Sequence, residues 1–262
     1  MVTYRVARVT DREVLRAFLE PHRYTYMHGD LHEPYWSSTE YWGAWSGERL
    51  AAVVLVYLPI TPHPILSAGE AAAVGAVYEQ VIVPRFPEIY YHLQMEHIEA
   101  AAQFYAFGAD HLPFWHMTCT PETFRTLAVN AARRLASIEA AAPGDLIYVP
   151  ERDLMHIPAA LIATGTFFGV EADGRVVAAA GTHVVSPETG CGVVGWVFTE
   201  PDYRGRGYAA ACTAAATAEL FQRGLSIVGL NVLQGNAPAL AVYEKLGYVI
   251  TNPLVEGTGT RI

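Results

Sequence analysis

The hydrophobic pattern in the second half of the chain predicts a run of short strands. Residues 166–171 and 175–184 are rich in apolar and β-branched side chains, and the pair Asp173-Gly174 between them is typical of a two-residue hairpin turn. Residues 193–198 form a continuous apolar run that indicates a buried strand. We therefore expect three successive antiparallel strands in this region.

Helices are predicted before and after these strands. The alanine-rich residues 209–223 predict a helix that ends at Gly224, residues 226–233 predict a further strand, and residues 152–164 predict a helix ahead of the hairpin. With a helix over residues 236–248 and a last strand after it, the order is helix, three strands, helix, strand, helix, strand. It indicates an α/β (α+β) three-layer fold, in which helices flank a mixed, mostly antiparallel sheet.

The helix predicted over residues 236–248 carries signals at both ends. Asn236 is a good N-cap, Pro238 falls in the first turn, and Gly247 is a natural stop. Near the end of the sequence, the run Gly257-Thr258-Gly259-Thr260 predicts a fraying tail.

The first half of the chain repeats part of this pattern. Residues 42–52 align without gaps on residues 168–178, at an offset of 168 − 42 = 126. A second match, at an offset of 236 − 97 = 139, pairs His97 with Asn236, Phe104 with Tyr243 and Gly108 with Gly247. We therefore predict two tandem lobes, residues 1–130 and 131–262. The alternative is two unrelated halves that share common Ala/Gly hairpin patterns.

The turn between the third predicted strand and the next helix is the most informative segment. It reads Arg204-Gly205-Arg206-Gly207-Tyr208-Ala209. A glycine-rich turn before a helix leaves backbone N–H groups unpaired, the helix dipole adds partial positive charge, and the two arginines add full charges. This turn therefore predicts a receptor for a phosphate or pyrophosphate. The equivalent place in the first half, Ala68-Gly69-Glu70, has one glycine, no arginine and an acidic residue, so no such receptor is expected there.

The turn and the capped helix together resemble the GNAT superfamily of acetyl-CoA-dependent N-acetyltransferases. The phosphate turn of that family reads Arg or Gln, two residues, Gly, one residue, Gly or Ala, which Arg204, Gly207 and Ala209 match. Its second pattern, an Asn-capped helix that ends in Tyr-x-x-x-Gly-Phe/Tyr, is matched by Asn236, Tyr243, Gly247 and Tyr248. The resemblance covers roughly residues 134–255 and makes the first lobe a degenerate GNAT-like sibling without a phosphate turn.

The resemblance implies acetyl-CoA as cosubstrate, and no metal is expected. Residues 204–209 would wrap the CoA pyrophosphate, and the pantetheine arm would pair with the backbone of Val197, Phe198 and Thr199, on a strand splayed away from the next one. A bulge on this strand would offer an N–H to the thioester oxygen. Gly195 permits such a bulge, although a plain strand glycine is an equal alternative. Asn236 would cap its helix and is a candidate contact with pantetheine.

Acetyl transfer to an amine also needs proton donors and acceptors. Tyr243 is the candidate general acid, because a phenol with a pKa of about 10 can protonate the departing thiolate without being ionised at neutral pH. The alternative for Tyr243 is a core aromatic. Among candidate bases, His183 has the most suitable unperturbed pKa. Glu171, Glu200 and water are the alternatives.

Composition narrows the partners and the setting. The net charge of −9 argues against nucleic acid and is compatible with a small cationic acceptor. The longest apolar run, residues 50–60, is too short to span a bilayer, and the first residues lack the apolar region of a signal peptide. The isolated Cys119, Cys191 and Cys212 indicate thiols in a reducing compartment. We expect a cytoplasmic protein that contacts neither nucleic acid nor membrane. The sequence does not fix whether it forms oligomers.

Residues 22–45 form a stretch rich in histidine and aromatic side chains. Gly29 and Pro34 interrupt any helix that would place His28 and His32 on one face, which argues against a metal site. An interface between the lobes or a wall of the acceptor pocket is the better interpretation.

The leading hypothesis is an N-acetyltransferase that moves an acetyl group from acetyl-CoA to a primary amine of a small molecule. Two alternatives stay open. One is a non-catalytic acyl-CoA-binding sensor or interaction protein on the same fold, and the other is an acyltransferase that uses a longer acyl-CoA.

Overall fold

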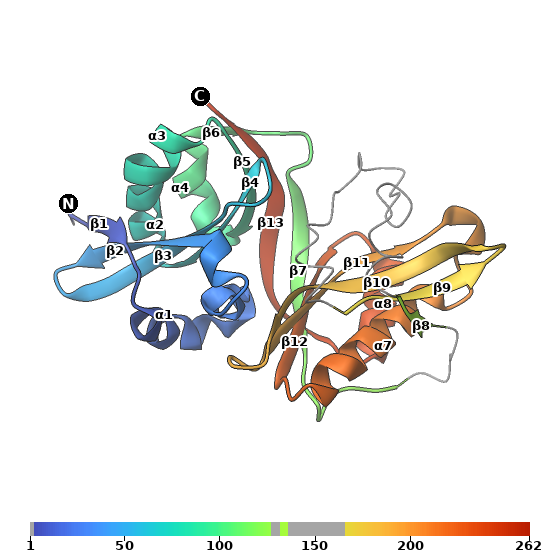
Figure 1. Cartoon of the computed structure of the whole chain (residues 1–262). Coiled ribbons are helices and arrows are strands. Elements are labelled where there is room, and N and C mark those ends of the chain that lie inside the picture. Colours follow the sequence, from blue (N-terminus) through green and yellow to red (C-terminus); the bar gives the residue numbers. More distant parts are fainter. Residues whose placement is uncertain (1–2, 127–131, 136–165) are drawn as a thin grey trace. The chain divides into compact units, whose positions relative to one another are not determined.

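A computed structural model of the chain describes residues 3–126, 132–135 and 166–262 (Figure 1). Contacts divide the chain into two compact units. Unit 1 comprises Met1–His116, Leu233–Gly235 and Thr251–Ile262, and unit 2 comprises Met117–Val232 and Asn236–Ile250. The predicted lobe boundary at residues 130 and 131 lies outside the described residues. The observed division is not contiguous, because the last residues of the sequence belong to unit 1 rather than to the second half.

Unit 2 contains the predicted hairpin and its neighbouring strands. Its sheet has the order β12-β11-β10-β9-β8, in which β11 pairs in parallel with β12 and the other pairs are antiparallel. The strands are β8 (Arg133–Arg134), β9 (Phe168–Ala172), β10 (Arg175–Ser186), β11 (Cys191–Thr199) and β12 (Ile227–Leu233). The predicted strands over residues 166–171, 175–184, 193–198 and 226–233 are therefore confirmed.

Two helices accompany this sheet. Helix α7 (Tyr208–Gln222) packs on β9, β10 and β11 (Figure 1). Its Cys212 is fully buried against Val177, Ala178 and Ala180. The helix predicted over residues 152–164 lies outside the part of the chain that the structure describes.

Helix α8 (Ala237–Lys245) begins and ends as its sequence predicts. The Asn236 side chain accepts a hydrogen bond from the Ala239 N–H at 3.2 Å. Gly247 has φ 92°, and the Tyr248 N–H donates to the Tyr243 carbonyl at 3.0 Å, which closes the last turn. A Cβ on Gly247 would lie 1.9 Å from the Thr123 carbonyl oxygen, so the close approach also requires glycine.

Unit 1 is built on a larger sheet with the order β1-β2-β3-β4-β5-β13, to which β6 adds by pairing with β13. Only β4 and β5 in this series pair in parallel. The strands are β1 (Arg5–Arg8), β2 (Thr39–Ser46), β3 (Arg49–Tyr57), β4 (His63–Gly69), β5 (Glu88–Gln94), β6 (Tyr105–Phe107) and β13 (Val249–Arg261), and β7 (Leu112–Cys119) spans the point where the chain enters unit 2.

The helical segments of unit 1 are short. They are α1 (Arg12–Leu19), η1 (Glu20–Thr25), η2 (Met27–Leu31), η3 (Trp36–Ser38), α2 (Ala71–Val77), η4 (Tyr78–Ile82), α3 (Val83–Arg85), η5 (Met95–His97) and α4 (Ile98–Ala102). The histidine-rich residues 22–45 thus form 3-10 turns and strand β2. Met27 and Leu31 pack with Leu15, Leu19 and Tyr41 in a core cluster.

The two units share one topology. The order β2, β3, β4, α2, β5, α4 in unit 1 repeats the order β9, β10, β11, α7, β12, α8 in unit 2, with the parallel pair at the same place. The predicted fold, a mixed and mostly antiparallel sheet flanked by helices in two lobes, is confirmed. In the part of the chain that is described, no helix combines the length and apolar character needed to cross a bilayer.

The prediction of a fraying tail over residues 257–260 is wrong. These residues belong to β13, which pairs with β5 from Leu254↔Gln94 to Thr260↔Glu88. The Gly-Thr alternation suits a strand that lies under large rings, since a Cβ on Gly257 would come within 2.8 Å of the Tyr91 hydroxyl. Small residues that look like a flexible tail therefore serve close strand packing.

Candidate functional site

The turn between β11 and α7 has the backbone geometry of an anion site. After the short η6 (Pro201–Tyr203), Gly205 and Gly207 adopt φ 77° and 78°, and Gly207 is the N-cap of α7. The first amide of this helix with a backbone acceptor is that of Ala211, which donates to Gly207 O at 3.0 Å. Across the described residues, the six N–H groups of 205–210 have no hydrogen-bond acceptor. Residues 204–207 of the turn are exposed, so the first of these donors are open to solvent at the positive end of the helix dipole.

Both arginines of the turn are held by backbone carbonyls. The Arg204 Nε donates to Thr199 O at 3.1 Å, and an Arg206 guanidinium nitrogen donates to Asp202 O at 3.2 Å. Arg206 also lies 5.1 Å above the Tyr203 ring. Each guanidinium has five N–H donors, so donors are left for a phosphate at the same turn.

Strand β11 leaves its partner β12 halfway along its length. The parallel pairing joins Cys191, Gly192 and Val193 to Ile227, Val228 and Gly229, and among the described residues it goes no further. On the other side, Phe198 and Thr199 still pair with β10. Among the described residues, the backbone of 197–199 therefore has one edge without a strand partner, as an extended amide chain such as pantetheine would need.

A β-bulge lies on β11 beside this open edge. The register passes from Gly181↔Gly195 to Ala179↔Phe198, so Trp196 and Val197 together face the single residue Ala180. Trp196 carries the left-handed backbone, with φ 54°. The bulge is thus one residue beyond the glycine from which it was expected.

Gly195 has a different role from the expected one. A Cβ at Gly195 would lie 1.9 Å from the His183 Nε2, so this glycine makes room for the His183 ring. The same ring lies 4.6 Å from the Trp196 ring at an interplanar angle of 41°. The structure therefore brings His183 to the bulge.

The other two candidate bases are each paired with an arginine. Glu171 forms an ion pair with Arg133, and Glu200 forms one with Arg175. Both carboxylates are therefore already engaged by a cation. His183 is the candidate base that the geometry favours.

Tyr243 lies on α8 and is buried. Burial raises the pKa of its phenol to about 12, so the hydroxyl keeps its proton at neutral pH. Its ring lies 6.1 Å from that of Tyr248, whose hydroxyl is 2.7 Å from Thr217 Oγ1. Tyr243 packs beside Tyr248, whereas His183 packs beside Trp196, so the two candidate residues share none of these ring contacts. The burial of Tyr243 also agrees with the alternative that it is a core aromatic.

Trp196 is the residue of this candidate site that sequence reasoning missed. A bulky side chain with positive φ is rare, so no local rule points to it. The bulge it forms was expected, but only on the more permissive glycine beside it.

Three comparisons bear on the site. Residues 133–248 match the model of the Acetyltransferase (GNAT) family. The mycothiol acetyltransferase of Saccharomonospora viridis is 44% identical over 92 residues, which are 33% of this chain and 30% of that protein. The matched stretch thus spans less than a third of the length of this curated relative.

Solved structures extend the likeness to both units. A Drosophila protein superposes with a TM-score of 0.70 at 13% identity, over 97% of this chain and 99% of that chain. A tandem GNAT protein from the clavulanic acid biosynthesis pathway superposes with a TM-score of 0.57 at 11% identity, over 99% of this chain and 98% of that chain. At these identities the structures show the fold alone.

Proposed function

Because residues 133–248 belong to the GNAT acetyltransferase family, we propose that this protein moves an acetyl group from acetyl-CoA to a primary amine of a small molecule. The observation that carries the proposal is the juxtaposition of two features at one end of β11. They are the donor-rich turn of residues 204–209 and the open strand edge of residues 197–199.

The turn holds the CoA pyrophosphate and the strand edge holds its arm. Six N–H groups and two arginines at the start of α7 neutralise the diphosphate. The pantetheine amides add to β11 at Val197, Phe198 and Thr199, as a further strand would. Asn236, at the N-cap of α8, is a second candidate contact for the arm.

The bulge supplies the hydrogen-bond donor for the thioester carbonyl. An N–H of the bulge donates to the thioester oxygen, where negative charge develops as the amine attacks. The nitrogen forms its bond to the carbonyl carbon, the carbon–sulfur bond breaks, and the electron pair goes to sulfur. His183 accepts a proton from the nitrogen, and Tyr243 protonates the departing thiolate.

The net charge of −9 supports a small cationic amine as the acceptor. The three cysteines are buried free thiols, which supports the expected reducing cytoplasm.

The test is release of free thiol from acetyl-CoA in the presence of a panel of primary amines. Tyr243→Phe should lower kcat by about 100-fold, while calorimetry gives an unchanged Kd for CoA. Gly207→Val is the matched variant, because it blocks the turn and should abolish CoA binding instead.

Other outcomes separate the alternatives. Binding of CoA with no thiol release across the panel would leave a non-catalytic acyl-CoA-binding protein. Faster transfer from a bulkier thioester than from acetyl-CoA would assign a longer acyl donor. Absence of CoA binding would overturn the proposal.

A further inference from the structure

Trp196 combines two unfavourable features in one residue. Its φ of 54° is a left-handed backbone conformation, which a bulky side chain adopts at a cost in energy. Glycine takes this conformation freely, and Gly195 stands next to it in the chain without doing so. Such outliers gather at ligand sites.

The indole of Trp196 is buried with an unpaired donor. Only 9% of the residue is exposed, and its Nε1–H has no acceptor in the described part of the chain. Tryptophan nitrogen can only donate a hydrogen bond. Buried donors without a partner are rare, because water has been lost and nothing replaces it.

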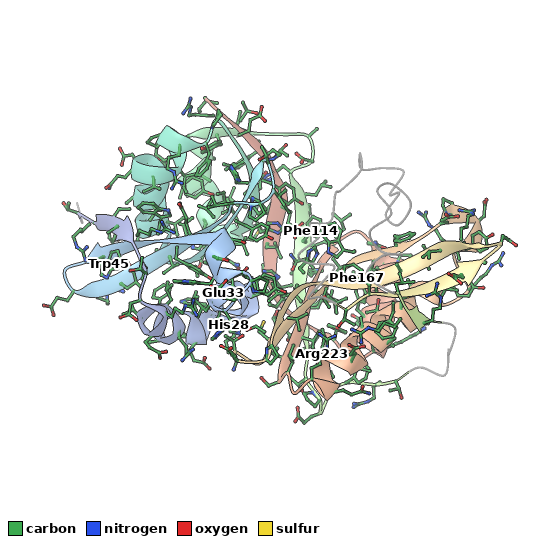
Figure 2. All side chains as sticks on the ribbon, in the orientation of Figure 1. His28, Glu33, Trp45, Phe114, Phe167 and Arg223 are labelled. Atoms are coloured by element: carbon green, nitrogen blue, oxygen red, sulfur yellow. The ribbon has the colours of Figure 1, made fainter. Side chains whose placement is uncertain are left out.

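The surroundings of the indole explain its packing but not its N–H. Gly181 and Gly195 face each other across β10 and β11, and each leaves room for a ring. A Cβ on Gly181 would lie 2.1 Å from Phe167, which is labelled in Figure 2, just as the space above Gly195 is taken by His183. Trp196 packs in this cluster with Phe167. A phenylalanine would serve the same packing without leaving a donor unpaired.

We propose that the indole N–H of Trp196 donates a hydrogen bond to the acceptor, and that acceptors therefore carry a hydroxyl, carbonyl or carboxylate oxygen close to the reacting nitrogen. This inference rests on the proposed function, which places the thioester carbonyl at the same bulge. An oxygen held by Trp196 brings the acceptor beside the ring of His183, 4.6 Å from the indole. Trp196 is then a specificity-determining residue of the acceptor site.

The kinetic test compares amines that differ in one oxygen. Ethanolamine, glycinamide and glycine supply a hydroxyl, a carbonyl and a carboxylate, and propylamine supplies none. Trp196→Phe keeps the aromatic packing and removes the N–H. It should lower kcat/KM by about fivefold to tenfold for the oxygen-bearing amines that react, and by less than about twofold for propylamine. Trp115→Phe, in unit 1, is the matched control and should change neither.

Two kinetic results would overturn the inference. One is an equal loss of kcat/KM for propylamine and for the oxygen-bearing amines. The other is a wild-type protein that prefers propylamine to all three of them. Wild type and Trp196→Phe are compared on the same amine. Differences in basicity between the amines therefore do not affect the ratio of the two kcat/KM values.

A second readout separates this inference from the proposed function. In protein with ¹⁵N-labelled indoles, loss of one N–H resonance in Trp196→Phe identifies the Trp196 signal. With CoA bound, an oxygen-bearing amine should move that signal downfield and propylamine should not. If no amine is acetylated but this shift occurs, the transfer proposal fails and the recognition stands. If none of the three oxygen-bearing amines moves the signal, the recognition fails.

Discussion

Asp30 offers the sharpest test of the energetics, because it is a buried acid without a counter-charge. It lies in η2 and is 9% exposed, and no ion pair or hydrogen bond to it is found among the described residues. Burial raises the pKa of its carboxyl from 3.8 to about 7. The neighbouring His28, labelled in Figure 2, is buried as well.

The sign of the pH dependence follows from proton binding. Between pH 3.8 and about 7 the folded state holds a proton on Asp30 that the unfolded state has released. The free energy of unfolding therefore falls as pH rises through this window, and the fall stops above the folded pKa. From pH 5 to pH 8 the loss that Asp30 causes is about 2.5 kcal/mol, at about 1.4 kcal/mol for each tenfold change in proton affinity.

Asp30→Asn removes the titration and keeps the shape. Urea unfolding followed by tryptophan fluorescence at pH 5 and pH 8 gives the free energy of unfolding of both proteins. Relative to wild type, the variant should gain about 2.5 kcal/mol between the two pH values. Asp202→Asn, at an exposed site in unit 2, is the control and should show no such gain. A constant difference between wild type and Asp30→Asn at both pH values would refute the reasoning, since the carboxyl would then be solvated or paired.

Three further outcomes are expected. Burial lowers the pKa of His28 to about 4. Between pH 6.5 and 4 the unfolded protein therefore binds a proton on His28 that the folded protein does not bind, and the free energy of unfolding falls on acidification. His28→Phe should remove up to about 3 kcal/mol of this loss, as measured by urea unfolding. Gly247→Ala should destabilise unit 2 by about 2–4 kcal/mol, because φ is 92° and the new Cβ meets Thr123 O at 1.9 Å; an unchanged melting temperature would contradict this. Arg204→Ala should raise the Kd for CoA by about tenfold at low salt and by less at 0.5 M salt, as calorimetry can check, and a salt-independent effect would argue against a charge contact.

Local chemistry made much of unit 2 predictable. The Asp173-Gly174 turn, the Asn236 cap and the Gly247 stop each act within a few residues, so the sequence alone marks the ends of β9, β10 and α8. The turn before α7 is equally local, because its glycines and the helix start define it together.

Features that depend on distant partners escaped prediction. The residues of β13 look like a flexible tail until β5 and the ring of Tyr91 are placed beside them. A bulge on β11 was expected at Gly195, but its position at Trp196 depends on context, because His183 from the adjacent strand occupies the space above Gly195. Neither arrangement leaves a trace in propensity or periodicity.

The pairing of β13 with β5 has a consequence for biosynthesis. Gln94 and its partner Leu254 are 254 − 94 = 160 residues apart, and ribosomes add about 5–20 residues per second. The unit that is made first therefore waits on the order of ten seconds or more with an unpaired strand edge. During that interval the unpaired edge is open to chaperones and to pairing with a wrong strand. Unit 1 is complete only once β13 has been synthesised and has paired with β5.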